Sequence, residues 1–175
     1  DPGIGQRLAG VRDSKQLSSG RREELLALIR ESALALGVGA VSAAEIDAMG
    51  IVSATRKAMA LALQARPCQA DCLLIDYLSL PTESLPQVSL PKGDVRVLSI
   101  AVASIVAKVT RDRVMAEIEA RFPGYGFARH KGYGTAQHRA ALETLGPCPA
   151  HRLSFAPLRT TWPGTEHLLS LDRRR

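Results

Sequence analysis

Apolar positions recur along most of the chain at the spacings that secondary structure imposes. The clearest helical stripe runs over 98–121, where Leu98, Val102 and Ile105 share one face. Pro123 ends this pattern. Weaker stripes predict further helices over about 20–36, 52–65 and 136–145.

Short apolar runs between these helices are typical of strands. Cys72 to Ile75 form a run of four apolar residues that leads directly into Asp76. Three prolines make 78–91 irregular and leave at most a short edge strand at Gln87–Leu90. Gly37–Val41 is a further strand candidate. Helices and strands that alternate in this way predict an α/β fold.

Capping residues indicate where several of the helices begin. Ser18 or Ser19 precedes the first helical stripe, and Thr135 precedes the last. Ser42 and Glu45 have the spacing of a capping box, in which each side chain bonds the backbone amide of the other residue.

The composition is typical of one soluble globular domain. The chain has 175 residues, of which 46% are apolar and 23% charged. No apolar run approaches the roughly 20 residues of a membrane span, so we expect no membrane partner. Three cysteines make no disulfide framework, and Cys68 and Cys72 are spaced too widely for a usual zinc pair. Because no signal peptide opens the chain, we expect a cytoplasmic protein.

The charge balance favours a polyanionic partner, although many proteins of similar charge bind no nucleic acid. The net charge is +6, and half of it lies in residues 151–175, where Arg173-Arg174-Arg175 is typical of a solvated terminus. From Lys92 to Lys131, eight basic residues accompany four acidic ones. A basic rim around a small acidic centre suits a metal site that cleaves phosphodiesters.

Two aspartates are the candidate metal ligands. Asp76 directly follows an apolar strand, and ligands gather at the carboxyl ends of strands in α/β folds. Asp94 lies 18 residues later, and a hairpin-like return of the chain would bring both carboxylates to one site. Two such carboxylates repel unless a hard cation such as Mg²⁺ or Mn²⁺ bridges them. Taken singly, each aspartate also fits an ordinary turn.

Other polar side chains have both a chemical and a structural interpretation. Lys108 and Asp112 are four residues apart on the longest helix, so an intrahelical ion pair is the simpler interpretation of Asp112. Tyr133 lies between two glycines, where its ring either faces a sugar or base or packs back on the domain. Nucleophilic catalysis has little support, because no serine stands in a nucleophile elbow and no Cys–His pair is evident. No phosphate-binding loop of the G-x-x-x-x-G-K-[ST] type is present.

Ordered motifs over residues 11–158 together resemble the ribonuclease HII family, the type 2 ribonucleases H. Each motif alone is weak, whereas the set in this order is highly specific. The motifs are Asp13-Ser14-Lys15-Gln16-Leu17-Ser18, Ala44-Glu45-Ile46-Asp47, Ala54-Thr55 with Ala58-Met59, Leu73-Leu74-Ile75-Asp76, Lys92-Gly93-Asp94, residues 99–113, Pro123-Gly-Tyr-Gly-Phe127, His130-Lys131-Gly132-Tyr133-Gly134-Thr135 and His151-Arg152-Leu153-Ser154-Phe155.

The resemblance implies an RNase H-like mixed sheet flanked by helices, with a helical C-terminal part. It implies endonucleolytic cleavage of RNA in RNA/DNA hybrids and of ribonucleotides embedded in duplex DNA, with Mn²⁺ or Mg²⁺ as the cofactor. Asp76 and Asp94 match two of the four catalytic, metal-binding carboxylates of the family. Tyr133 matches the tyrosine that packs on the sugar at the RNA–DNA junction. The candidate phosphate contacts are Lys15, Lys92, Lys108 and Arg111.

The sequence departs from the family pattern in two ways. The other two carboxylates belong to an N-terminal Asp-Glu-Ala-Gly-Arg-Gly segment, which this sequence lacks together with its ribose-reading Gly-Arg-Gly element. Tyr77 stands where the family usually has Gly. Loss of a central strand exposes several large apolar side chains worth ~1.5–3 kcal/mol each, against a total stability of ~5–15 kcal/mol. We therefore expect a truncated ribonuclease HII that has little activity by itself.

Residues 1–158 are expected to form an N-terminally truncated RNase H-like domain, and 159–175 a C-terminal tail, in a chain that is monomeric by default. One competing hypothesis is a non-catalytic nucleic-acid-binding module that keeps the basic rim and Tyr133. Another is a structural fragment of a larger assembly. Salt-dependent duplex binding without cleavage favours the module, and failure to bind nucleic acid at low salt favours the structural fragment.

Overall fold

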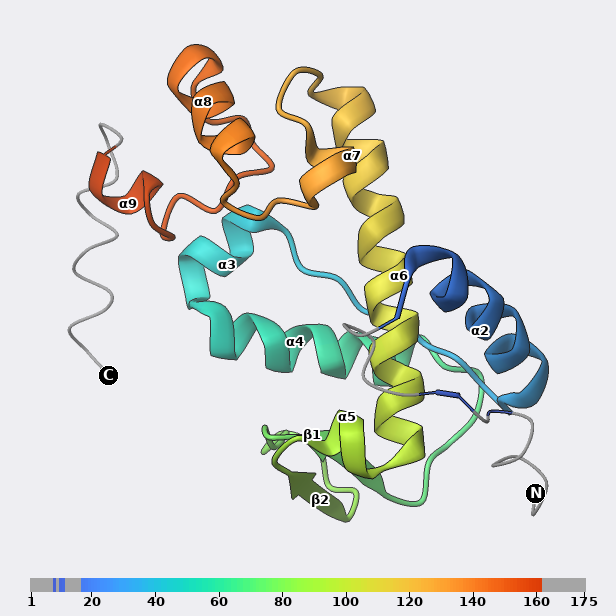
Figure 1. The fold of residues 1–175 in the computed structure, drawn as a ribbon. Coiled ribbons are helices and arrows are strands. Elements are labelled where there is room, and N and C mark those ends of the chain that lie inside the picture. The colour runs from blue at the N-terminus through green and yellow to red at the C-terminus, as the bar shows by residue number, and fades with distance from the viewer. Residues whose placement is uncertain (1–7, 9, 12–16, 162–175) are drawn as a thin grey trace. The chain divides into compact units, whose positions relative to one another are not determined.

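The computed structural model describes residues 8, 10–11 and 17–161. Helices and strands combine in an α/β fold, which confirms the predicted class. None of the described helices has the length and apolar character needed to cross a membrane. In chain order the elements are α2 (Ser19–Ser32), α3 (Ala43–Met49), α4 (Ile51–Gln64), β1 (Leu73–Asp76), β2 (Gln87–Leu90), α5 (Gly93–Arg96), α6 (Leu98–Arg121), α7 (Phe127–His130), α8 (Ala136–Leu145) and α9 (Leu158–Thr161) (Figure 1).

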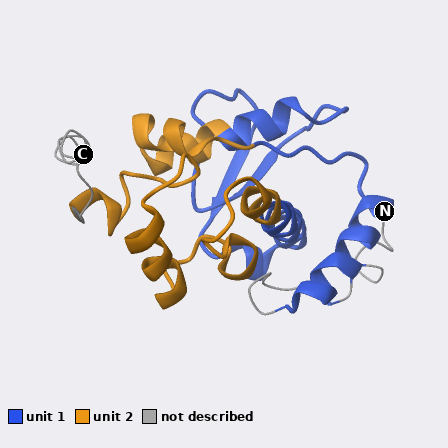
Figure 2. Cartoon of the chain, turned by 90° about the horizontal axis from the view of Figure 1, so that it is seen from above, with its two compact units in different colours: residues 1–39, 58–113 blue, residues 40–57, 114–175 orange. Residues whose placement is uncertain are grey.

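The chain divides into two compact units (Figure 2). Residues 1–39 and 58–113 form the first unit, and residues 40–57 and 114–175 form the second. Helices α4 and α6 therefore each contribute residues to both units.

The observed helices agree with the predicted ones where the signals are local. Helix α6 has the predicted bounds, and α4 and α8 match to within one residue. The Ser18 hydroxyl caps α2 by accepting from the Arg21 amide at 3.2 Å, and Thr135 caps α8 in the same way. Helix α2 ends at Ser32, before the predicted end at 36, because Ala33 has an extended backbone with ψ of 136°.

In the first unit, α2 packs against the N-terminal part of α6. An ion pair between Arg113 and Glu23, 2.5 Å apart, joins the exposed sides of these two helices. The apolar cluster between them consists of Leu8, Leu25, Leu26, Ile29, Ile105, Val106 and Val109. Because all its members except Leu8 recur at helical spacing, the same stripes that predict the helices also form most of this core.

The sheet of the first unit consists, within the described residues, of β1 and β2, which run parallel. Helix α4 covers one face of it, because Met59 and Leu63 pack on the buried cluster of Leu73, Ile75 and Leu80. The alternation of buried and exposed residues along β1 follows from the period of two that strands impose.

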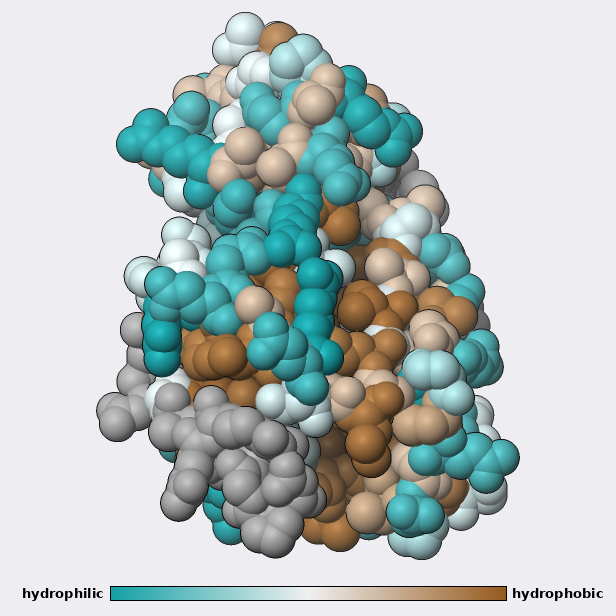
Figure 3. Space-filling view, turned by 90° about the vertical axis from the view of Figure 1, so that its right-hand side faces the viewer, coloured by the Kyte–Doolittle hydropathy of each residue, from teal (hydrophilic) through white to brown (hydrophobic). Residues whose placement is uncertain are grey.

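The opposite face of this sheet carries exposed apolar side chains. Leu74 and Val88 are register partners on the two strands, and both are exposed. Parallel sheets are usually covered on both faces, so this open face is unusual. Apolar surface also lies between hydrophilic side chains on the face drawn in Figure 3.

The strand predicted at Gly37–Val41 is wrong, since residues 35–42 form neither helix nor strand. Two glycines explain the apolar, extended pattern of this segment. A Cβ at Gly37 would overlap the Ala62 carbonyl oxygen of α4, and a Cβ at Gly39 would overlap that of Ala58. The glycines therefore permit a close approach of the chain to α4 rather than pairing in a sheet.

The second unit has its own apolar core around two aromatic rings. Tyr125 and Phe127 are stacked, with ring centroids 5.1 Å apart, and the Tyr125 hydroxyl donates to the Gly146 carbonyl at 2.7 Å. Asp47 ties α3 to the C-terminal part of the unit by accepting from the Leu153 amide at 2.8 Å. The buried members of the core are Met115, Tyr125, Phe127, Leu142 and Leu158.

The predicted capping box is present at the start of α3. The Ser42 hydroxyl accepts from the Glu45 amide at 3.3 Å, and the Glu45 carboxylate accepts from the Ser42 amide at 2.9 Å. Lys57 of α4 also donates to this carboxylate at 2.7 Å. The hydrogen bonds from Lys57 and Ser42 lower the pKa of Glu45 to about 2.

We predict opposite stability changes for two Gly→Ala substitutions in the first unit. Gly39→Ala should lower the free energy of unfolding by about 1–3 kcal/mol, because the new methyl group meets the backbone of α4. Gly20→Ala should raise it by about 0.5–1 kcal/mol, because no atom lies within 4 Å of the new methyl group and alanine favours helix. Urea unfolding at constant m-value measures both, and equal effects of the two substitutions would contradict the close approach.

Candidate active site

The parallel pairing of β1 and β2 determines which residues meet at one edge of the sheet. Asp76 ends β1 and is the register partner of Leu90, which ends β2. Since parallel strands have their carboxyl ends at the same edge, the chain that follows Leu90 begins beside Asp76. The hairpin-like return expected from the sequence is therefore wrong, because the two strands point in the same direction.

The Lys92-Gly93-Asp94 segment turns sharply at this edge. Lys92 has a left-handed backbone with φ of 55°, and the Gly93 amide then donates to Oδ1 of Asp76 at 2.9 Å. A Cβ at Gly93 would lie 2.6 Å from Cδ1 of Ile100, so a larger residue would displace the Ile100 side chain or the segment itself. Asp94 follows in the first turn of α5. The Asp76 carboxylate is thus hydrogen-bonded to the residue that precedes Asp94.

Within the described residues, no lysine or arginine forms an ion pair with either of these aspartates. Asp76 is exposed and Asp94 half-buried. Oxygen donors of this kind suit a hard divalent cation. The donor set is nevertheless small, because no group of three or more His, Cys, Asp and Glu side chains that could hold a metal occurs within 17–161. These residues fit part of a metal site.

Tyr77 occupies a backbone conformation that favours glycine. Its φ is 65°, and the Leu78 amide donates to the Asp76 carbonyl at 2.7 Å across it, which closes a γ-turn. The side chain is 76% exposed. The tyrosine thus stands directly beside a candidate metal ligand, with its ring in solvent.

The candidate phosphate contacts lie on different elements. Lys108 of α6 forms the predicted intrahelical ion pair with Asp112 at 2.7 Å, and Arg22 approaches the same carboxylate at 3.4 Å. Lys92 and Arg111 are exposed. Lys15 lies outside the described residues.

Tyr133 belongs to the second unit, in the loop between α7 and α8. The residue is 67% exposed, which favours the interpretation in which its ring faces a ligand. Its backbone, in contrast, is held firmly: its amide donates to the His130 carbonyl at 2.9 Å, and its carbonyl accepts from the Thr135 amide at 2.8 Å.

Three buried histidines lie directly beneath this loop, and the sequence reasoning missed them. His130 and His138 are stacked with ring centroids 4.4 Å apart, and Nε2 of His138 lies 3.1 Å from Nε2 of His151. Nδ1 of His138 lies 3.0 Å from the Tyr133 carbonyl oxygen. One signal was available, because His138 and the buried Leu142 are four residues apart on the apolar stripe of α8.

The surroundings of His138 and His151 favour the neutral forms of these two rings. Burial lowers the pKa of His138 and of His151, against the opposing effect of their hydrogen bonds to backbone groups. The Sγ atom of Cys148 lies 3.2 Å from Nδ1 of His151, so a Cys–His contact exists that the sequence did not reveal. Burial raises the pKa of the Cys148 thiol, which makes it a poor nucleophile.

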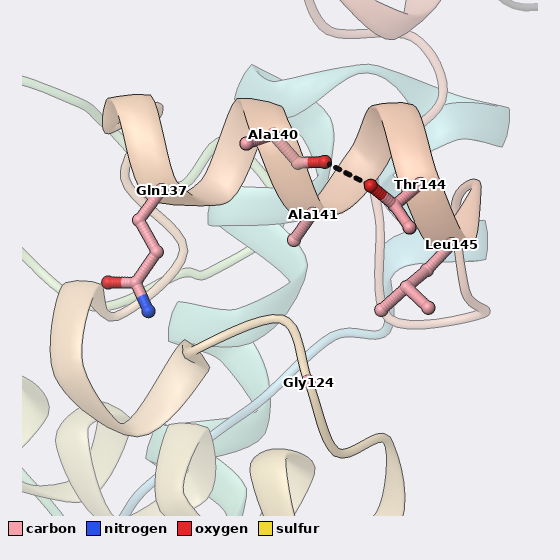
Figure 4. Close-up of a pocket in the computed structure, with 6 residues that line it drawn as sticks. All are labelled: Gly124, Gln137, Ala140, Ala141, Thr144 and Leu145. Carbon is pink, nitrogen blue, oxygen red and sulfur yellow. Dashed lines mark hydrogen bonds between the residues drawn. The ribbon is translucent and has the colours of Figure 1, made fainter.

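An open depression in the second unit has no chemistry of its own. It encloses about 430 Å³ and is lined by residues of α8 and by Gly124 (Figure 4). The Thr144 hydroxyl faces it but donates to the Ala140 carbonyl at 3.0 Å. Its lining contains no titratable side chain, so we do not place the active site there.

Comparison with known proteins identifies the family to which the chain belongs. The sequence profile described as Ribonuclease HII matches residues 6–158. The chain belongs to the ribonuclease HII family. The ribonuclease HII of Chloroflexus aurantiacus is 57% identical over 166 residues, which are 95% of this chain and 76% of that protein. The ribonuclease HII of Geobacter metallireducens is 54% identical over 151 residues, or 86% of this chain and 71% of that protein.

Solved structures agree on the fold. The ribonuclease H2 of Pyrococcus horikoshii OT3 superposes with a TM-score of 0.68 at 21% identity, covering 100% of this chain and 88% of that chain. The ribonuclease HII in a PCNA complex from Archaeoglobus fulgidus superposes with a TM-score of 0.61 at 27% identity, covering 82% and 74%. Family and fold together support an RNase H-type nuclease.

The buried histidines predict a loss of stability in mild acid. The pKa values of His138 and His151 are lower in the folded chain than in the unfolded chain, so below about pH 6.5 the unfolded state binds more protons. The free energy of unfolding should therefore stay level from about pH 8 to 7 and decrease from about pH 6.5 to 5.5, above the range of ordinary carboxylates. Urea midpoints across this range measure it, and a midpoint that rises on acidification would contradict the direction of the shifts.

The left-handed backbone at Tyr77 predicts an unusual order of stabilities. Tyr77→Gly should leave the free energy of unfolding within about 1 kcal/mol of the starting value. Relief of the backbone strain at positive φ offsets the greater conformational entropy that glycine gives the unfolded chain. Tyr77→Val should lower it by about 1 kcal/mol, since a β-branched residue resists positive φ. Tyr133→Val is the control, because Tyr133 is also exposed but lacks positive φ. Equal urea midpoints for the Tyr77→Gly and Tyr77→Val variants would rule out the strain.

Proposed function

We propose that the protein is a metal-dependent endoribonuclease that cleaves the RNA strand of RNA/DNA hybrids and ribonucleotides embedded in duplex DNA. The observation that carries this proposal is the hydrogen bond from the Gly93 amide to Asp76, which ties two aspartate-bearing segments together at one sheet edge. Membership of the ribonuclease HII family supports the same chemistry.

In this proposal Asp76 and Asp94 hold Mn²⁺ or Mg²⁺. When bound, such ions activate a water molecule and stabilise the leaving 3′ oxygen. The Gly93 amide donates to Oδ1 of Asp76 and so also orients Oδ2, the other oxygen of this carboxylate. The two remaining carboxylates of the family lie in the Asp-Glu-Ala-Gly-Arg-Gly segment, which this sequence does not contain. The chain by itself should therefore have little activity.

The proposed substrate contacts rest on charge for the basic residues and on exposure for Tyr133. Lys15, Lys92, Lys108 and Arg111 contact phosphates, and Tyr133 packs on a sugar through its exposed ring. The 2′-hydroxyl distinguishes ribose from deoxyribose at the cut. We further propose that residues 1–158 act as one RNase H-like domain with 159–175 as a tail, in a monomeric cytoplasmic protein without a membrane partner.

A non-catalytic nucleic-acid-binding module is the second candidate. The small number of metal donors within 17–161 favours it, because two aspartates alone hold a divalent ion weakly. The two functions differ in one measurable respect. Both bind duplexes in a salt-dependent way, but only the nuclease cleaves them when metal is added.

We predict that Asp76→Asn abolishes most of the cleavage. The experiment uses the extended protein, in which the 175-residue chain carries the family's Asp-Glu-Ala-Gly-Arg-Gly segment at its N-terminus. The neutral amide loses the charge that holds the metal, so turnover on a duplex with one ribonucleotide should fall by roughly two or more orders of magnitude. Duplex affinity, measured by fluorescence anisotropy, should change little.

Asp71→Asn is the matched control, because Asp71 is an exposed aspartate that precedes β1 in the same segment. It removes the same charge and should leave turnover unchanged. Near-normal turnover of Asp76→Asn would remove Asp76 from the site. An extended protein that binds the duplex in a salt-dependent way but never nicks it, with either metal, would establish the binding module instead. Efficient nicking by the 175-residue chain alone would contradict the need for the missing carboxylates.

A further inference from the structure

The buried histidines of the second unit form a continuous chain of hydrogen bonds that ends on the backbone of Tyr133. The Cys148 amide donates to Nδ1 of His151 at 2.9 Å. Nε2 of His151 lies 3.1 Å from Nε2 of His138, whose Nδ1 lies 3.0 Å from the Tyr133 carbonyl oxygen. All the ring atoms involved belong to residues that are buried.

The two ends of this chain of hydrogen bonds determine which ring nitrogen of His138 and of His151 carries the hydrogen. The Tyr133 carbonyl can only accept, so Nδ1 of His138 carries the hydrogen and its Nε2 accepts. His151 must then donate from its own Nε2, which leaves its Nδ1 to accept from the Cys148 amide, as the 2.9 Å distance requires. The bonds are satisfied by one arrangement of neutral rings. A proton added to Nε2 of His138 places two N–H groups face to face. A proton added to Nδ1 of His151 breaks the bond from the Cys148 amide and leaves this nitrogen the Cys148 carbonyl oxygen, 3.2 Å away, as its acceptor.

His130 supports the same loop from the other side. Its Nε2 lies 2.7 Å from the Tyr125 carbonyl oxygen, so it donates there, and its Nδ1 accepts from the Gly132 amide at 3.2 Å. Its ring stacks on that of His138. The backbones of Gly132 and Tyr133 are therefore both hydrogen-bonded to buried imidazoles. The Tyr133 side chain remains exposed.

The carboxylates around this cluster are engaged by backbone amides, and that of Glu119 on α6 accepts from the Gly124 and Phe127 amides. Lys131 belongs to the loop, Arg139 of α8 donates to the Gly134 carbonyl, and Glu143 of α8 is exposed. Cys148 and Tyr125 are buried, un-ionised groups with raised pKa values. The Asp47 carboxylate accepts from the Leu153 and Ser154 amides instead. A proton on the cluster thus has no anionic partner among these groups.

We infer that His138 is a positioning residue for substrate: together with His151 it holds the Tyr133 carbonyl so that the exposed ring meets the sugar of a ribonucleotide-containing duplex. This inference rests on the proposed function and deepens it. Because the arrangement requires neutral rings, acidification weakens recognition of the ribonucleotide through the loop.

Two substitutions at one position separate positioning from simple packing. In His138→Asn the amide nitrogen lies close to the place of Nδ1 and can still donate to Tyr133, whereas in His138→Gln the amide extends toward His151 and the bond to Tyr133 is lost. Tyr125→Phe is the control, because it removes a buried hydrogen bond, to Gly146 at 2.7 Å, from the same core without touching the loop.

The readout is the ratio of dissociation constants for an all-DNA duplex and the same duplex with one ribonucleotide, measured with the extended protein. We expect His138→Gln to reduce this preference by about tenfold, the effect of one lost hydrogen bond, and His138→Asn to retain most of it. Tyr125→Phe should lower the urea midpoint yet leave the preference unchanged. The starting protein should lose part of its preference between about pH 8 and 5.5, and His138→Gln should show a flatter profile.

The possible failures are distinguishable. If the starting protein has no ribonucleotide preference and no metal-dependent cleavage, the proposed function fails. If it cleaves normally and all three variants keep the preference, or all lose it in proportion to stability, the positioning role of His138 is overturned. Nitrogen-15 spectra of the histidine rings give a test without substrate on the 175-residue chain: a hydrogen on Nε2 of His138 would overturn the proton assignment, and one on Nδ1 supports it.

Discussion

The pairing of two short parallel strands sets the position of everything at the candidate active site. Because β1 and β2 end in register, the residues after Leu90 begin at the edge where Asp76 leaves the sheet. The tight turn at Lys92 and the absence of a side chain at Gly93 then let a backbone amide reach the Asp76 carboxylate. A shift of one residue in this register would move Asp76 to the other face of the sheet and separate the two aspartates.

In the second unit, the backbone of the Tyr133 loop is held by hydrogen bonds while the tyrosine side chain is exposed to solvent. An exposed tyrosine between glycines would ordinarily sample many orientations. Here the loop is attached to buried imidazoles on one side and to the first turn of α8 on the other. The polar core beneath the loop is fully hydrogen-bonded, which makes it a specific arrangement rather than a general apolar contact.

The sequence predicted the features whose cause is local. The stripe over 98–121, the Ser42–Glu45 capping box and the Thr135 cap depend on residues three or four apart, and each was found where expected. Strand direction carries no such signal, so the return from Asp76 to Asp94 was wrongly expected to be a hairpin. Residues 37–41 were predicted to be a strand because their pattern is extended and apolar. A segment that approaches a helix closely, as Gly37 and Gly39 do, has the same pattern. The histidine chain escaped notice because its partners lie at 133, 138, 148 and 151, and only the tertiary fold brings them together.

The carboxylate of Glu45 behaves unlike the imidazoles of the same unit when the solution becomes acidic. It remains ionised down to about pH 2, so the start of α3 and its link to Lys57 outlast the hydrogen bonds that require neutral rings. In the folded protein, acidification therefore reaches the histidine rings well before it reaches the capping box at the start of α3.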